Sequence, residues 1–427
     1  METLQEFLSF SDANVRFVAL GAVLLAISSA MVGVFIVLRQ KALVGDAVSH
    51  SILPGIAAAF LFSGSKHLGW LIVGAFFTGW LSLALIDWLI RHTRVRKDAA
   101  IALMLSVFFG LGMVLLTHIQ HQGNAAQSGL ESFIFGKAAA LVGQDVWVFS
   151  GIAFLLILVI MLFMKELTLI AFDEAYATSL GLPVGKLDFL LTGLTVLAVI
   201  TGVTAVGVVL MSAMLITPAV AARFWTHDIR KMMWVAAGIG AFSGLSGAYL
   251  SYIAPAMPTG PWMVVVSSLI AFISFFFAPR VGLVSRWWKN LKRRRKIMEE
   301  DILKTFYQFG EQTQDFTAGV SLEQLRTSRG WELKRLVKYI RMMQVRGRLV
   351  HRDGTWHLSS TGLKAAKRIV RLHRLWELYL NTYMHVAPHQ VHENAEWIEH
   401  IITPELEKEL AKTLGYPEKD PHNSIIP

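Results

Sequence analysis

The sequence predicts an all-α polytopic membrane protein of about nine transmembrane helices, followed by a cytoplasmic winged-helix domain with further helices. Three observations support this fold class. The 427 residues are 54% hydrophobic and only 16% charged, with a mean hydropathy of +0.51. Long apolar stretches fill the first 280 residues, and the composition changes abruptly near Arg280. This balance excludes a disordered chain and disfavours an ordinary soluble enzyme. The absence of Cys excludes disulfide frameworks and Cys-based nucleophiles or metal sites.

A helix needs roughly 20 apolar residues to cross about 30 Å of hydrocarbon. Seven segments meet this requirement clearly, and two others are interrupted by polar residues. The first segment is kept as a span because acidic residues precede it and no small-residue cleavage site follows. The clear spans lie near residues 15–38, 68–90, 99–117, 145–164, 205–225, 231–253 and 261–279, and the interrupted ones near 46–62 and 188–204.

The distribution of Lys and Arg predicts the orientation, because cytoplasmic loops carry an excess of positive residues. Alternate loops hold little beyond Lys66 and Lys137. The N-terminus is therefore expected outside and the C-terminal domain in the cytoplasm. The basic loops carry Arg39 and Lys41; Arg91, Arg94, Arg96 and Lys97; Lys165 and Lys186; Arg223, Arg230 and Lys231; and the cluster after Arg280.

Polar side chains interrupt the span near 46–62. Asp46 and His50 are four residues apart and share a face if the segment is helical. A carboxylate and an imidazole at membrane depth suit a divalent transition metal, and Pro54 would interrupt the helix there. The alternative is that Asp46 caps a helix while His50 bonds a neighbouring carbonyl. Pro218 is expected to break a second span, and the alternative there is a purely structural kink.

The cytoplasmic loop at 166–187 contains a short amphipathic segment that ends near Gly181 and Pro183. A helix outside the membrane could dock on a partner protein, or it could be a plain surface connector. The sequence contains no Gly-rich phosphate loop of the nucleotide-binding type. If ATP drives the protein, another chain must bind it.

Together, segments 45–55, 174–184 and 206–222 resemble the permease subunit of manganese/zinc/iron ABC uptake transporters, over about residues 10–280. The resemblance implies a bacterial plasma (inner) membrane protein with two permeases, the second being a copy or a sibling. It also implies two cytoplasmic ATPases and an extracellular or periplasmic metal-binding protein. Asp46 and His50 become a candidate transport site, with Pro54 and Pro218 on the pathway. The expected ATPase-coupling residues are Glu174, Ala175, Ala177, Leu180 and Gly181.

The tail after residue 298 has soluble composition and predicts short helices at 301–309, 321–327 and 331–346. Period-two alternation around Asp353-Gly354 then predicts a hairpin, and another helix should run from Thr361 to about Met384. This order is that of a winged helix. Residues 326–348 carry eight Lys/Arg against only Glu332, so this surface could meet DNA phosphates. The alternative is a solvated or lipid-facing basic surface.

The last helices carry a metal-site pattern. Glu396, Glu399 and His400 are spaced to lie on one helix face. His373, four residues before Glu377 on the preceding helix, would add an imidazole. Such an oxygen and nitrogen set without thiolate suits manganese or ferrous iron and does not exclude zinc.

Residues 299–427 are similar to metal-dependent repressors of the diphtheria toxin repressor/manganese regulator family. The similarity rests on segments 372–377, 391–400, 415–417 and 420–427. It implies that His373, Glu396, Glu399, His400 and Asp301 occupy ligand positions, and that Glu377 and His392 fall on an ancillary metal site. Glu396 stands where iron-type members have Cys, as in the manganese type. Lys304 replaces a second carboxylate on the first helix, which argues against a two-metal site.

The expected domains are a transmembrane permease (1–280), a basic juxtamembrane linker (281–298), a winged helix (299–368) and a helical metal-binding, dimerisation-like domain (369–427). We expect a non-enzymatic permease subunit of an ATP-driven importer of manganese, iron or zinc. Its cytoplasmic tail is expected to sense the same class of divalent ion. The alternative is a membrane-tethered, metal-dependent DNA-binding regulator, and a plainer one is an assembly module. Membrane lipids surround the first part in every case.

Overall fold

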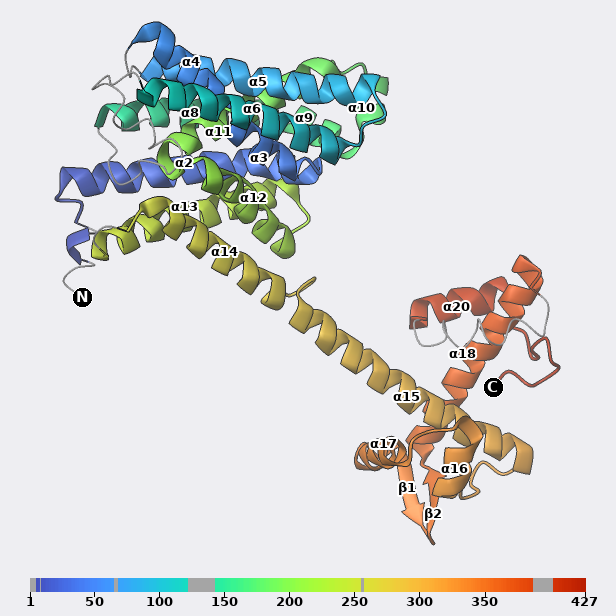
Figure 1. The fold of residues 1–427 in the computed structure, drawn as a ribbon. Helices are drawn as coiled ribbons and strands as arrows, with labels where there is room; N and C mark the ends of the chain where they lie inside the picture. The colour runs from blue at the N-terminus through green and yellow to red at the C-terminus, as the bar shows by residue number, and fades with distance from the viewer. Residues whose placement is uncertain (1–4, 8, 65–67, 122–142, 255–256, 387–401) are drawn as a thin grey trace. The chain divides into compact units, whose positions relative to one another are not determined.

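The computed structural model describes all residues except 1–4, 8, 65–67, 122–142, 255–256 and 387–401 (Figure 1). The chain divides into two compact units, Met1–Arg286 and Trp287–Pro427. The division lies close to the change in composition near Arg280, where apolar sequence gives way to basic sequence.

The first unit is a bundle of long helices lying side by side (Figure 1). Among the described residues, eight helical segments are long and apolar enough to cross a membrane, and a bent pair makes a ninth. This confirms the predicted all-α membrane fold. The helices are α2 (Ala13–Leu38), α3 (Ala42–Ser51), α4 (Leu53–Ser63), α5 (Leu68–His92), α6 (Lys97–His121), α8 (Gly143–Leu162), α9 (Met164–Phe172), α10 (Glu174–Ser179), α11 (Val184–Val206), α12 (Val208–Trp225), α13 (Ile229–Ile253) and α14 (Thr259–Phe277).

The span predicted near 145–164 corresponds to α8 (Gly143–Leu162), which is followed by a sharp bend. α8 ends at Leu162, and the chain bends by 69° into α9. No Pro or Gly marks this bend, since the turning residue is Phe163. Hydropathy measures length and composition but not direction, so the pattern does not reveal the bend.

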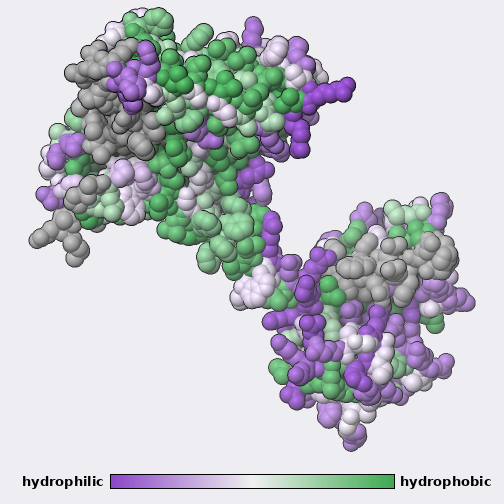
Figure 2. Space-filling view, in the orientation of Figure 1, coloured by the Kyte–Doolittle hydropathy of each residue, from purple (hydrophilic) through white to green (hydrophobic). Residues whose placement is uncertain are grey.

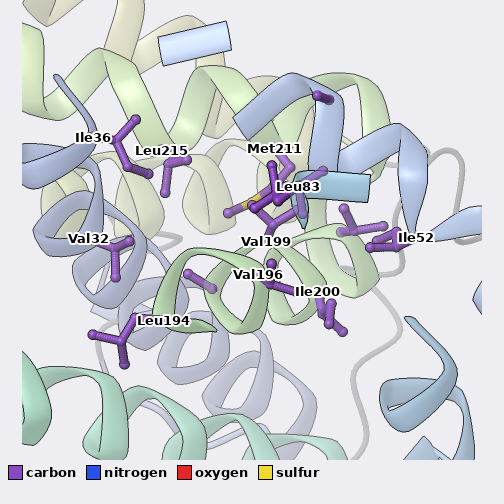
Figure 3. Close-up of a cluster of buried hydrophobic side chains, with 14 of the residues drawn as sticks. Val32, Ile36, Ile52, Leu83, Leu194, Val196, Val199, Ile200, Met211 and Leu215 are labelled. Atoms are coloured by element: carbon purple, nitrogen blue, oxygen red, sulfur yellow. The ribbon is translucent and has the colours of Figure 1, made fainter. Parts of the chain in front are cut away.

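The core of this unit forms where α11 lies against α2, α5 and α12. Val196, Val199 and Ile200 of α11 are at most 1% exposed. Figure 3 shows them among Val32, Ile36, Ile52, Leu83, Met211 and Leu215. The outer surface is also apolar (Figure 2), with Trp147 80% and Leu162 71% exposed. An apolar core under an apolar surface is what a lipid-surrounded bundle requires.

Close helix packing depends on glycine at one crossing in particular. A Cβ at Gly33 of α2 would lie 1.8 Å from the carbonyl oxygen of Leu215 in α12. We therefore expect Gly33→Ala to destabilise the bundle by about 3 kcal/mol, the upper end for overpacking. Thermal unfolding in detergent would measure the loss. Gly110→Ala is the matched control, because its new methyl group meets open space, and equal melting temperatures for the two variants would contradict the prediction.

The second unit has the predicted order of helix, turn, helix, hairpin and helix. Ser321 begins α16 with a capping box, and β1 pairs antiparallel with β2, Leu349 opposite Leu358. Asp353 and Gly354 both have positive φ, 48° and 75°, as a two-residue hairpin turn requires. The elements are α15 (Leu283–Thr313), α16 (Leu322–Arg329), α17 (Leu333–Val345), β1 (Leu349–Arg352), β2 (Thr355–Leu358), α18 (Ser360–Met384) and α20 (Pro404–Thr413).

The short helix predicted at 301–309 is instead the end of the long helix α15. The basic segment before it contains no Pro or Gly from Leu283 onward, and Lys and Arg are good helix formers. The juxtamembrane linker predicted at 281–298 is therefore mostly helical.

Candidate functional site

Asp46 and His50 lie on the same face of α3, as their spacing predicts. His50 Nε2 is 3.7 Å from Asp46 Oδ1. α3 ends at Ser51 and α4 begins at Leu53, with Pro54 in its first turn. The break expected at Pro54 thus lies two residues earlier. It consists of one residue, Ile52, which keeps helical backbone angles.

The donor atoms of this pair differ in their surroundings. His50 Nδ1 is buried and has no hydrogen-bond partner among the described residues. The Phe109 ring stands edge-on to the imidazole at 5.1 Å between ring centroids. The Asp46 side chain is 41% exposed and that of His50 19%. No group of three or more acidic, His or Cys side chains that could hold a metal occurs among the described residues.

Neighbouring helices hold α3 in place through small groups. The hydroxyls of Ser51 and Ser82 are hydrogen-bonded at 2.8 Å, joining α3 to α5. Gly45 admits the Leu215 side chain of α12, which would lie 2.8 Å from a Cβ at that position. Pro218 lies inside α12, and the helix continues on both sides of it. The expected break at Pro218 is therefore wrong, and the chain instead breaks at Gly207, before α12 begins.

The predicted coupling segment contains the short helix α10. The Asp173 side chain caps it by accepting the Tyr176 backbone N–H at 2.8 Å, and Gly181 has a φ of +79° just after its end. Ala177 is fully buried, whereas Leu180 is 56% exposed. Of the remaining coupling candidates, Glu174, Ala175 and Gly181 are also exposed. Four of the five predicted coupling residues are thus exposed, and Ala177 is buried.

A charge cluster that sequence reasoning missed ties α10 to two spans. Arg39, whose side chain is 9% exposed, pairs closely with Asp188 of α11 and lies 3.7 Å from Glu174 of α10. Lys41 adds a contact of 3.4 Å to Asp188. Asp188 is the one acidic residue of α11 (Val184–Val206), and an acidic residue next to basic loops was the available signal.

Asp188→Asn is expected to lower stability by about 3 kcal/mol, because it leaves the buried Arg39 guanidinium without its main carboxylate. Glu174→Gln is the matched control, since the Glu174 side chain is 64% exposed and exposed pairs contribute little. Melting of both variants in the same detergent checks this. A larger loss in Glu174→Gln would contradict it.

The tail places two predicted metal ligands in a buried cluster with a lysine. Lys304, His373 and Glu377 are at most 4% exposed. Lys304 Nζ lies 3.0 Å from His373 Nδ1, and His373 Nε2 lies 3.0 Å from Glu377 Oε1. Asp301 is half-buried on α15. The other predicted ligands, His392, Glu396, Glu399 and His400, lie outside the described residues.

The two ring nitrogens of His373 face different side chains, Nδ1 that of Lys304 and Nε2 that of Glu377. Next to it, Arg374 donates to Glu311 at 2.8 and 2.7 Å and contacts Asp420 at 3.4 Å. Burial lowers the pKa of this guanidinium, but the bond to Glu311 and the charges of Glu311 and Asp420 outweigh it and raise the pKa. The ion pair thus fixes α18 against α15.

Residues 11–278 match the family model of the ABC 3 transport family. This chain belongs to that family. Residues 359–427 match the iron dependent repressor, metal binding and dimerisation domain. Both resemblances found in the sequence are therefore confirmed, and this member of the ABC 3 family is a multi-pass membrane permease with a repressor-type domain after it.

Similar proteins agree with this assignment. The chain is 39% identical over 383 residues to the manganese transport system membrane protein MntC of Bacillus subtilis, covering 89% of this chain and 87% of that one. It is 41% identical over 292 residues to the zinc transport system membrane protein TroC of Treponema pallidum, covering 68% and 97%. The solved structure of PsaBC from Streptococcus pneumoniae in complex with Fab matches 67% of this chain and 99% of that chain, at 29% identity and a TM-score of 0.60.

Proposed function

We propose that this chain is the membrane permease subunit of an ATP-driven importer of divalent transition metals. The observation that carries the proposal is the Asp46–His50 pair, with its unpartnered imidazole nitrogen, inside a bundle of the ABC 3 family. The names of the relatives, a manganese and a zinc system, favour these two ions as substrates. Iron as a substrate is supported only by the resemblance to the wider family. Pro54 and Pro218 flank the pathway in this account.

ATP hydrolysis belongs to a separate cytoplasmic subunit that docks on α10. The exposed Leu180 beside the buried Ala177 and the missing phosphate-binding loop support this division of labour. An extracellular or periplasmic protein delivers the metal, and a second copy or a sibling permease completes the pathway. The basic loops then face the cytoplasm and place the tail there as well.

The tail senses cytoplasmic metal and adjusts transport to supply. Its repressor-type match covers residues 359–427, and the predicted ligands Asp301, Glu396, Glu399 and His400 carry the oxygen and nitrogen chemistry that manganese prefers. Metal in the tail would favour one of two arrangements of tail and permease, which is all that regulation requires.

A second function, DNA binding by a membrane-tethered regulator, is favoured by one observation. The α17 helix exposes Lys334, Lys338 and Arg341 on the side away from its buried Leu336 and Ile340. Retention on duplex DNA that requires metal and weakens steeply with salt would favour this function. Retention independent of metal and of DNA sequence would leave only a basic surface.

The permease function is tested by growth in metal-depleted medium. Cells that lack their own importers should grow when they express this chain together with its ATPase and binding protein. Growth should fail when the ATPase carries a disabled nucleotide site. Full rescue by the permease alone, without any ATPase, would contradict an ATP-driven system.

A further inference from the structure

The first half of α15 is basic and exposed. Residues 287–296 read Trp-Trp-Lys-Asn-Leu-Lys-Arg-Arg-Arg-Lys, which gives six Lys/Arg and no acidic residue. Every one of these residues is exposed except Leu291, which is half-buried. We propose that this juxtamembrane segment binds the headgroups of anionic lipids in the membrane that holds the spans. This rests on the proposed function in one respect, namely that the leaflet concerned is the cytoplasmic one.

The covalent chain holds the segment close to the membrane. The last candidate span, α14, ends at Phe277, and α15 begins at Leu283. The five residues between them form turns, and the Gly282 N–H donates to the Ala278 carbonyl at 3.0 Å. Even a fully extended connection of this length would span only about 20 Å, and the headgroup layer begins where the hydrocarbon ends. The start of α15 is therefore within reach of lipid headgroups.

Apolar and basic side chains of the juxtamembrane segment occupy different sides of the helix. With about 3.6 residues per turn, Trp287, Trp288 and Leu291 fall on one side, which ends one turn later at Arg294 and Arg295. Trp287 is 60% and Trp288 57% exposed. Trp is enriched where hydrocarbon meets headgroups, because its ring is apolar and its N–H is polar. An apolar side of this kind next to a basic side is typical of a helix that rests at a lipid surface. The basic side carries Lys289, Lys292, Arg293 and Lys296.

The charge of the segment selects an anionic ligand, and its apolar side selects lipid. Each Lys or Arg near an anionic membrane surface strengthens binding by roughly fivefold. The four consecutive basic residues 292–295 are exposed, whereas Arg346 and Arg348, elsewhere in the tail, both contact the buried Glu299. Duplex DNA would offer the same phosphate charge, but its surface has no apolar layer to receive the two Trp side chains. Anionic lipid is therefore the ligand that uses both sides of the helix.

The absence of Cys permits a single spin label at a chosen position of the full-length chain. Leu291→Cys places the label on the apolar side, and Asn290→Cys places it off that side. The chain is reconstituted in nanodiscs of phosphatidylcholine alone, or of phosphatidylcholine mixed equally with phosphatidylglycerol. In the anionic discs, collisions of the Leu291→Cys label with a water-soluble nickel chelate should fall severalfold relative to those of the Asn290→Cys label, and high salt should reverse the fall. Equal collision rates of the two labels in the anionic discs, or a fall of the same size in phosphatidylcholine alone, would overturn the proposal.

Removing charge gives a second readout. Gln at all four positions 292–295 should abolish the difference between the two labels in anionic discs. A matched control removes four exposed basic residues elsewhere in the tail and should keep the difference, with the substitutions Lys334→Gln, Lys338→Gln, Arg341→Gln and Lys367→Gln. Because all the substituted residues are exposed, neither variant removes a core contact.

A difference between the labels that survives Gln at 292–295 would overturn the proposal. So would a difference that appears in phosphatidylcholine discs when duplex DNA is added and is absent from the anionic discs, because the segment would then bind nucleic acid. None of these measurements uses transport, so failure of the permease function would be a separate result.

Discussion

Metal uptake should fall by about 100-fold or more in Asp46→Ala, while the complex with the ATPase still assembles. Removing even an outer-shell group typically lowers metal affinity 10- to 100-fold, and Asp46 is proposed as a direct ligand. The pair offers only two donors, so losing the carboxylate leaves His50 alone. Initial rates of Mn²⁺ entry into vesicles, with the ATPase co-purified in equal amounts, measure the effect.

Ser49→Ala is the control for this substitution. Ser49 lies in the same helix and is buried, but its hydroxyl donates to the Gly45 carbonyl of its own helix at 2.8 Å. Because this hydrogen bond lies within α3, removing the hydroxyl should not disturb a neighbouring helix, and near-normal uptake is expected. If Asp46→Ala transported as well as Ser49→Ala, the proposed transport site would be wrong.

The second large effect is expected in the tail. Replacing both Glu399 and His400 with Ala should abolish the inhibition of uptake by metal inside the vesicle, while the basal rate remains. Coupling between two sites typically changes affinity by about 5- to 150-fold, so inhibition should disappear over at least a tenfold range of internal Mn²⁺. Uptake into vesicles preloaded with graded Mn²⁺ gives the curve.

A double substitution of matched size provides the control. Lys408 and Glu409 are both exposed on α20, and changing them to Ala should leave the inhibition curve in place. If the variant lacking Glu399 and His400 gave the same curve as this control, metal sensing by these residues would be refuted. The tail would then act in assembly or in DNA binding.

The sequence predicts the spans well because a transmembrane helix needs only length and apolarity. It could not predict the 69° bend at Phe163, since no helix-breaking residue marks it. It also could not reveal that α12 continues through Pro218, where packing against neighbours outweighs the missing N–H. The sequence also did not predict the long helix α15. The change in composition suggested a boundary near residue 298, whereas the helix runs without interruption from Leu283 to Thr313.

The candidate sites also differ in how far the sequence alone predicts them. Asp46 and His50 are neighbours through helical periodicity alone, so their spacing in the sequence was sufficient. Arg39 and Asp188 are 149 positions apart, and only the packing of α2 against α11 brings them together.

The central claim, that this chain carries divalent metal across a membrane at the expense of ATP, is tested most directly by transport in sealed vesicles. These would contain the chain, its ATPase and its binding protein, and the initial rate of Mn²⁺ entry would be measured with and without ATP. Entry that requires ATP, is competed by Zn²⁺ and is lost in Asp46→Ala is the predicted result. Entry at the same rate without ATP, or none with every component present, would contradict the account.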